Sequence, residues 1–120
     1  MKKNVVREKS FDFALRIVEA YKFLCKERKE FVLSKQLLRS GTSIAANTEE
    51  ADASISRPEF SAKISIAYRE ARETHYWLKL LYRANYFDEK TFDSIIADCD
   101  ELCKLLFSIL RSSDRIRSNN

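Results

Sequence analysis

Glycine and proline each occur only once in this chain of 120 residues, as Gly41 and Pro58. A β-sandwich or β-barrel needs many tight turns, and such turns depend on these two residue types at several positions. The Gly-rich phosphate-binding loops of Walker and Rossmann nucleotide sites also need more than one glycine, so both are excluded. The chain is therefore predicted to be all-α. With 45% hydrophobic residues it can build one core and is too apolar to be disordered.

Apolar residues recur every three or four positions over four segments, as they do on amphipathic helices. The predicted helices cover about residues 10–26, 31–55, 58–84 and 88–113. Their short connections favour an antiparallel up-down-up-down four-helix bundle, with residues 1–120 as a single domain and frayed basic termini. No apolar run approaches the roughly 18 residues of a membrane span, and the N-terminus is too charged for a signal peptide. We therefore expect a cytoplasmic protein without membrane contact.

Capping residues mark where these helices begin and end. Ser10 is predicted to cap the first helix, and Ser56 and Glu59 have the spacing of a capping box before the third. Asn85 is the predicted stop of the third helix, and Asp88 is the predicted cap of the fourth. The turns between the helices are therefore expected to be short.

The middle of the second segment, residues 40–46, contains only small side chains apart from Ile44. Gly41 inside a helix costs on the order of 1 kcal/mol relative to alanine, so its presence needs a structural reason. The favoured interpretation is one continuous helix whose small residues admit a closely packed neighbour. The alternative is a break that divides the segment into two helices.

The third segment carries a second apolar stripe, whereas one helix of a monomeric bundle rarely needs two. This stripe combines three apolar side chains with two carboxylates: Ile66, Trp77, Leu80, Glu70 and Glu73. We predict that these residues form the contact between subunits of a homo-oligomer. An unpaired buried carboxylate is costly, so a basic partner is expected. For Trp77, burial within its own subunit is the second interpretation and base stacking is the third.

The net charge of +4 is modest, but four cations gather on one side of the third segment. At about 100° per residue they project within roughly 80° of one another: Arg69, Arg72, Lys79 and Arg83. Such a stripe can follow a phosphate backbone, since each neutralised phosphate releases counterions. The alternative is a solvated face whose cations pair locally with Glu73. The sequence shows no aromatic platform for single strands.

Metal binding and catalysis find little support in the sequence. The three cysteines, Cys25, Cys99 and Cys103, are predicted to be small buried residues, because with one histidine they do not supply a zinc site of about four ligands. His75 follows Arg69 at a spacing found in one class of helical ribonucleases, but on a helix the two project about 120° apart. We predict no metal, no cofactor and no enzymatic activity.

Two long motifs resemble one bacterial protein family. Residues 31–47 read FVLSKQLLRSGTSIAAN and are followed by Glu49-Glu50-Ala51, while residues 60–78 read FSAKISIAYREARETHYWL. Both are similar to signatures of the four-helix-bundle family that includes the 23S rRNA intervening-sequence proteins, and the resemblance covers nearly the whole chain. Many members carry a segment of the Glu-Gly-x-Gly-Arg type after the second-helix asparagine. Residues 50–57 read EADASISR instead, so this junction is expected to differ.

The resemblance implies a small up-down bundle that assembles into a homopentamer with a central channel. The second-helix motif includes Arg39, so the resemblance also makes Arg39 a candidate partner of the two carboxylates. It also implies a role beside nucleic acid, because a related accessory protein of diversity-generating retroelements binds nucleic acid and pairs with a reverse transcriptase. We therefore predict a non-enzymatic oligomeric protein that binds RNA or DNA. A protein-interaction scaffold, with a reverse transcriptase or another protein as partner, is the alternative. A ribonuclease that uses His75 is the least favoured.

Overall fold

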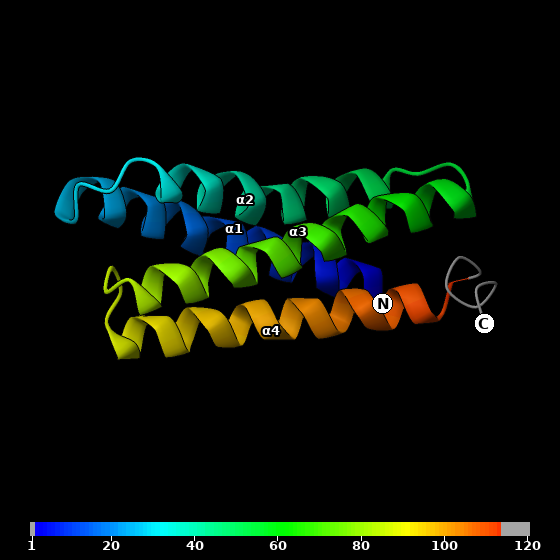
Figure 1. Cartoon of the computed structure of the whole chain (residues 1–120). Coiled ribbons are helices and arrows are strands. Elements are labelled where there is room, and N and C mark those ends of the chain that lie inside the picture. The colour runs from blue at the N-terminus through cyan, green and yellow to red at the C-terminus, as the bar shows by residue number, and fades with distance from the viewer. Residues whose placement is uncertain (1, 114–120) are drawn as a thin grey trace.

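Four helices pack side by side, and each runs back along the helix before it (Figure 1). The computed structural model describes residues 2–113. Its helices are α1 (Lys2–Glu27), α2 (Leu33–Asp52), α3 (Arg57–Arg83) and α4 (Glu89–Arg111). α2 packs against α1 and α3, and α4 packs against α3 and, less closely, against α1. No strand occurs within residues 2–113, and the all-α prediction is confirmed.

Each helix contributes side chains to one shared core. The largest of the fully buried apolar residues are Ile17 and Leu24 in α1, Leu37 and Ile44 in α2, Ile64, Leu78 and Leu81 in α3, and Leu102 and Leu106 in α4. Burying such a side chain contributes about 1.5–3 kcal/mol. These fully buried residues thus occupy one face of each helix. Among the described helices, none has the combination of length and hydropathy needed to cross a bilayer.

Helix α1 begins well before the position predicted for its cap. It starts at Lys2, and Ser10 is a fully buried residue inside the helix whose hydroxyl has no partner among the described residues. Val6 is also buried, so the core stripe extends about one turn upstream of the predicted helix start at residue 10. The Ser10 cap and the predicted start of the first helix at residue 10 were therefore wrong. Fraying of the termini stays a prediction, and residue 1 and residues 114–120 lie outside the described residues.

Helix α2 begins at Leu33 because a glutamate before it binds its first amides. The Glu30 carboxylate accepts hydrogen bonds from the backbone N–H groups of Val32, Leu33 and Ser34 at 2.6–3.1 Å. Burial alone would raise the pKa of Glu30, but these three hydrogen bonds hold that pKa below its ordinary value. The predicted start at residue 31 was two residues early, and the predicted end at residue 55 was three residues late.

The segment around Gly41 is helical throughout, so the continuous helix is confirmed. A Cβ atom placed on Gly41 would lie 2.7 Å from both Cγ1 and Cγ2 of Ile17 in α1. Gly41 is therefore the point where α1 and α2 approach too closely for any side chain, and this contact is the structural reason for a glycine inside a helix.

The remaining predicted caps are present. The Ser56 side chain accepts from the Glu59 amide at 3.2 Å, and the Asp88 side chain accepts from the Thr91 amide at 2.7 Å. Asn85 has a φ of 71°, the left-handed conformation that ends many helices. Residues 53–56 form the whole turn between α2 and α3.

Candidate nucleic-acid interface

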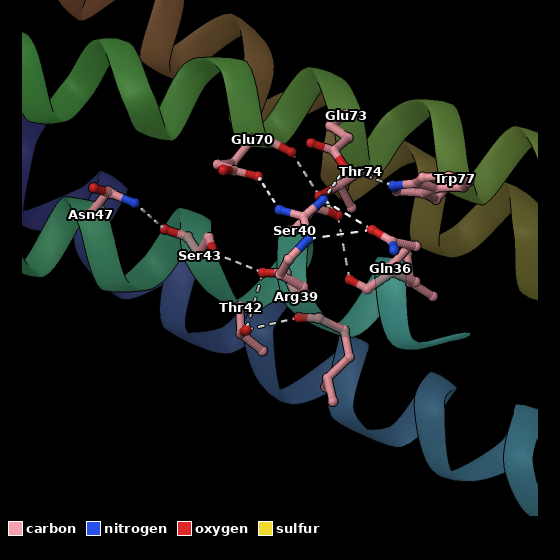
Figure 2. Close-up of polar contacts among 12 residues, drawn as sticks. Gln36, Arg39, Ser40, Thr42, Ser43, Asn47, Glu70, Glu73, Thr74 and Trp77 are labelled. Carbon is pink, nitrogen blue, oxygen red and sulfur yellow. Dashed lines mark hydrogen bonds and ion pairs between the residues drawn. The ribbon is translucent and has the colours of Figure 1, made fainter. Parts of the chain in front are cut away.

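An arginine from α2 reaches two carboxylates of α3 (Figure 2). Nη1 of Arg39 lies 3.4 Å from Oε1 of Glu70, and its Nη2 bonds to Oε2 of Glu73. Gln36 Oε1 accepts from the same guanidinium at 3.3 Å. The indole Nε1 of Trp77 donates to Glu73 Oε2 at 2.9 Å. The predicted pairing with Arg39 is thus present, and Glu73 is an acceptor shared by two donors of its own chain.

A buried pair of hydroxyls lies beside this cluster. Oγ1 of Thr74 and Oγ of Ser40 are 2.9 Å apart, and both residues are fully buried between α2 and α3. Thr74 also hydrogen-bonds the backbone carbonyl of Glu70 at 2.8 Å. Because buried hydroxyls need partners, this contact favours one register of α2 against α3. That register places Arg39 opposite the two carboxylates.

The five residues predicted for a subunit contact lie along the edge of α3 that borders α2. All of them are half-buried in the single chain: Ile66, Glu70, Glu73, Trp77 and Leu80. Trp77 packs against the core of its own chain, where its N–H is already satisfied. Both carboxylates therefore have an intrachain partner, and the assignment of this strip to a subunit contact stays a prediction.

The four cations predicted to contact phosphates are all exposed on α3: Arg69, Arg72, Lys79 and Arg83. They project away from the buried stripe of the helix, which contains Ala71 and Leu78. Within residues 5–113, none of the four forms an ion pair. Local pairing with Glu73 would have neutralised them, but Glu73 bonds to Arg39 and Trp77 instead.

Several basic residues elsewhere are neutralised across helix boundaries. The shortest of these ion pairs join Arg7 to Asp52 at 2.5 Å, Lys63 to Glu50 at 2.6 Å and Arg16 to Asp98 at 2.7 Å. The basic N-terminal segment is therefore partly paired. The unpaired cations on α3 differ from these, because they share one narrow face of a single helix.

An exposed aromatic residue, which was not predicted from the sequence, lies among the four cations of α3. Tyr76 is 56% exposed, and at about 100° per residue it projects between Arg69 and Arg83. Its ring packs edge-on against Trp77, with ring centroids 5.0 Å apart and planes inclined by 66°. The helical spacing of Tyr76 from Arg72 and Lys79 was the available signal. We name this surface, formed by Tyr76 and the four cations, the α3 outer face.

His75 faces α4 rather than the α3 outer face. Its Nε2 lies 2.9 Å from Oδ1 of Asp100, and its side chain is 23% exposed. This position is turned away from Arg69, as the helical spacing predicts. The two residues thus do not converge on one point of the surface.

The cysteines of α4 are buried, as predicted, whereas Cys25 is only half-buried. The Cys99 thiol donates to the backbone carbonyl of Ala71 at 3.4 Å. Its hydrogen bond with Cys103 and its burial raise the pKa of Cys99. The same hydrogen bond and the nearby Arg72 lower the pKa of Cys103, against the effect of burial. The part of the chain that is described contains no group of three or more side chains suited to a metal ion.

Comparison with known proteins gives one family. The model of the family described as 23S rRNA-intervening sequence protein matches residues 2–108. A crystal structure at 1.70 Å resolution of a protein of unknown function from the S23 ribosomal protein family of Bacteroides thetaiotaomicron VPI-5482 is 54% identical to this chain. The match covers 93% of this chain and 100% of that one, with a TM-score of 0.91. No curated protein matches. The chain belongs to the 23S rRNA-intervening sequence protein family.

Proposed function

We propose that this protein is a small, non-enzymatic helical bundle that self-associates and binds RNA or DNA through the α3 outer face. The observation that carries the proposal is the commitment of Glu73 to Arg39 and Trp77. This arrangement leaves four neighbouring cations on one helix without a described carboxylate partner. A phosphate backbone supplies the complementary charge. The family description, which refers to 23S rRNA, supports RNA as the first nucleic acid to test.

The test is a titration of the purified protein into labelled RNA derived from 23S rRNA, at low and at high salt. Four phosphate contacts on a single strand give a log–log salt slope of about −2.8, so a fourfold increase in salt weakens binding about 50-fold. We expect binding at low salt that weakens to this extent. An RNA that does not bind at low salt would contradict the proposal.

Self-association is the second part of this proposal, with a homopentameric ring as the expected assembly. The strip of Ile66, Glu70, Glu73, Trp77 and Leu80 stays half-exposed in one chain, so apolar area is left for a second copy to cover. Light scattering is expected to give a multiple of the 14.1 kDa chain mass. The variant Ile66→Ser/Leu80→Ser is expected to shift the mass toward a single chain. A single-chain mass for the wild type at high concentration would contradict this part.

A protein-interaction scaffold without nucleic-acid binding is the alternative, and a different surface favours it. Phe11 and Leu15 of α1 are 57% and 53% exposed, one helical turn apart. Beside Leu15, a groove of about 400 Å³ opens between α1 and α4 and is lined mainly by apolar side chains that include Phe23 and Phe87. This alternative predicts that a purified partner, with a reverse transcriptase as the first candidate, binds in the presence of nuclease. That binding should be lost in Phe11→Ser/Leu15→Ser.

A further inference from the structure

We propose that the α3 outer face takes single-stranded nucleic acid, with one unpaired base stacked on the ring of Tyr76. This inference rests on the proposed function, because it names the form of nucleic acid that the same face recognises. It adds Tyr76 as the residue that distinguishes an unpaired strand from a duplex. Three properties of the Tyr76 ring favour this role: its exposure, its position between two cations and its contact with Trp77.

Tyr76 places an aromatic ring at an exposed position of α3, where a polar side chain is more usual. The side chain is 56% exposed, although aromatic residues contribute most to stability when they are buried. Arg72 lies one turn before it and Lys79 lies one turn after it, and both are exposed. An aromatic ring between two cations is the arrangement by which proteins hold single strands, with cations on the phosphates and the ring on a base.

The Tyr76 ring is supported from one side by residues that do not belong to the face. Its edge contact with Trp77 restricts the ring, and the indole of Trp77 is in turn held by Glu73. Glu73 is bonded to Arg39 of α2, so the support extends to a second helix. A ring held in this way needs little ordering when a base stacks on it, which favours binding.

The charges that border the face are consistent with a polyanionic ligand. Glu70 and Glu73 both contact Arg39, which offsets one of their two negative charges, and Oδ1 of Asp100 lies 2.9 Å from Nε2 of His75, away from the face. From Arg69 to Arg83 the face extends about 21 Å along the helix at 1.5 Å per residue. This length accommodates several nucleotides of an extended strand.

An unpaired strand fits this face better than a duplex. In a duplex the faces of the bases are covered by their neighbours, so Tyr76 would find no base to stack on, and only the cations would contribute. The deep, narrow major groove of an RNA duplex also does not admit side chains that read bases. We therefore expect both single-stranded RNA and single-stranded DNA to bind more tightly than the corresponding duplexes.

Trp77 provides a direct readout, because it is the single tryptophan of the chain and its ring touches that of Tyr76. The experiment follows Trp77 emission while oligoadenylate of about twelve nucleotides is added to the full-length protein. Three further probes are used: the DNA equivalent, the same strand annealed to its complement, and an abasic strand of equal length that keeps the phosphates. The unpaired strands are expected to quench the emission in a saturable manner. The abasic strand is expected to bind more weakly and to quench less.

Two variants of Tyr76 separate the ring from the charges. Tyr76→Ala is expected to weaken binding of the unpaired strand about fivefold or more, which corresponds to about 1 kcal/mol or more of stacking. Its affinity for the abasic strand should not change, and this second value also shows that the variant is folded. Tyr76→Phe keeps a ring of the same shape and is expected to bind the unpaired strand as the wild type does.

The outcomes distinguish this inference from the proposed function. Binding that is equal for base-bearing and abasic strands, stronger for the duplex, or unaffected by Tyr76→Ala overturns the stacking on Tyr76 and leaves the phosphate contacts in place. Failure of every strand to bind at low salt overturns the proposed function and this inference together. If a protein partner covers the α3 outer face and no nucleic acid binds, the proposed function and this inference are also overturned together.

Discussion

Glu73 follows Arg72 directly and lies four residues after Arg69, so on an isolated helix it would pair with the cations of α3. In the folded chain its carboxylate instead accepts from Arg39 and Trp77. One residue of α2 therefore decides whether the α3 outer face keeps its full positive charge. The effect is indirect, since Arg39 itself lies on the neighbouring helix.

The variant Arg39→Gln tests this role at the scale of the residue. It leaves Glu73 free to turn toward Arg69, so RNA binding at low salt is expected to weaken by about the contribution of one phosphate contact. The free energy of unfolding is expected to fall by about 1 kcal/mol, because charge-assisted hydrogen bonds are lost at a partly exposed site. Binding titrations and urea unfolding measure the two effects.

The double variant Arg39→Gln/Glu73→Gln is the matched control. It removes the carboxylate that Arg39→Gln releases, so RNA binding should return to the wild-type level while stability stays reduced. If the double variant binds as weakly as Arg39→Gln, Arg39 acts in some other way than by holding Glu73.

At the scale of the residue, the sequence predicted the ion-pair partners of side chains better than it predicted which side chains are exposed. The pairing of Arg39 with two carboxylates was expected from the family motif that includes Arg39, together with the cost of leaving a carboxylate without a cation. The exposure of Tyr76 could not be predicted in the same way, since it depends on where α2 and α4 lie beside α3. Ser10 was assigned as a cap because serine is common there, whereas α1 continues upstream to Lys2, so that Ser10 lies inside the helix and is buried.

The packing of α1 on α2 gives a prediction at the scale of the element. Gly41→Ala places a methyl group 2.7 Å from two carbons of Ile17, a fully buried β-branched residue with little freedom to move. Overpacking of this kind costs about 1–3 kcal/mol, more than the gain of about 1 kcal/mol in helix propensity. Urea unfolding is therefore expected to show a less stable variant.

Ala46→Gly provides the control within the same helix. Ala46 is exposed, so the substitution changes propensity alone and should also destabilise, by about 1 kcal/mol. Compared with glycine, alanine is thus expected to make the protein more stable at position 46 and less stable at position 41. A stabilised Gly41→Ala would show that α1 and α2 do not approach as closely as described.

The start of α2 gives a prediction that depends on pH. The pKa of Glu30 is lowered in the folded state, so its contribution to stability is present above its unfolded pKa and disappears as the pH falls through the folded value. Glu30→Gln is expected to lower the free energy of unfolding by about 1 kcal/mol at neutral pH. The difference from the wild type should vanish in acid. A difference that is the same at both pH values would contradict the capping role.

The type and order of the helices followed from apolar spacing, but their ends depended on individual contacts. Ser56 and Asp88 could be assigned as caps, because short polar side chains before an apolar stripe are the usual arrangement. Glu30 fell between the helices predicted over residues 10–26 and 31–55, since a glutamate that binds three amides of the following helix has no distinctive spacing. The close approach at Gly41 was predicted correctly from the small residues around it.

At the scale of the molecule, the proposed function of α3 depends on both of its neighbours. α2 supplies Arg39, which contacts both Glu70 and Glu73 and offsets one of their two charges, and α4 supplies Asp100, whose Oδ1 lies 2.9 Å from Nε2 of His75. All four cations are exposed on α3, and Arg72 among them also lies near the Cys103 thiol of α4. The antiparallel order could be predicted from short turns, whereas the number of subunits depends on surfaces between chains that the spacing within one chain does not specify.

The salt dependence of RNA binding, measured for two charge-matched double variants, shows whether the phosphates lie along α3. Lys79→Ala/Arg83→Ala removes two cations of the α3 outer face, and Lys26→Ala/Lys35→Ala removes two exposed cations from α1 and α2. The account predicts that the log–log slope for a single strand falls from about −2.8 to about −1.4 in the first variant and is unchanged in the second. Equal slopes in the two variants would contradict binding through α3.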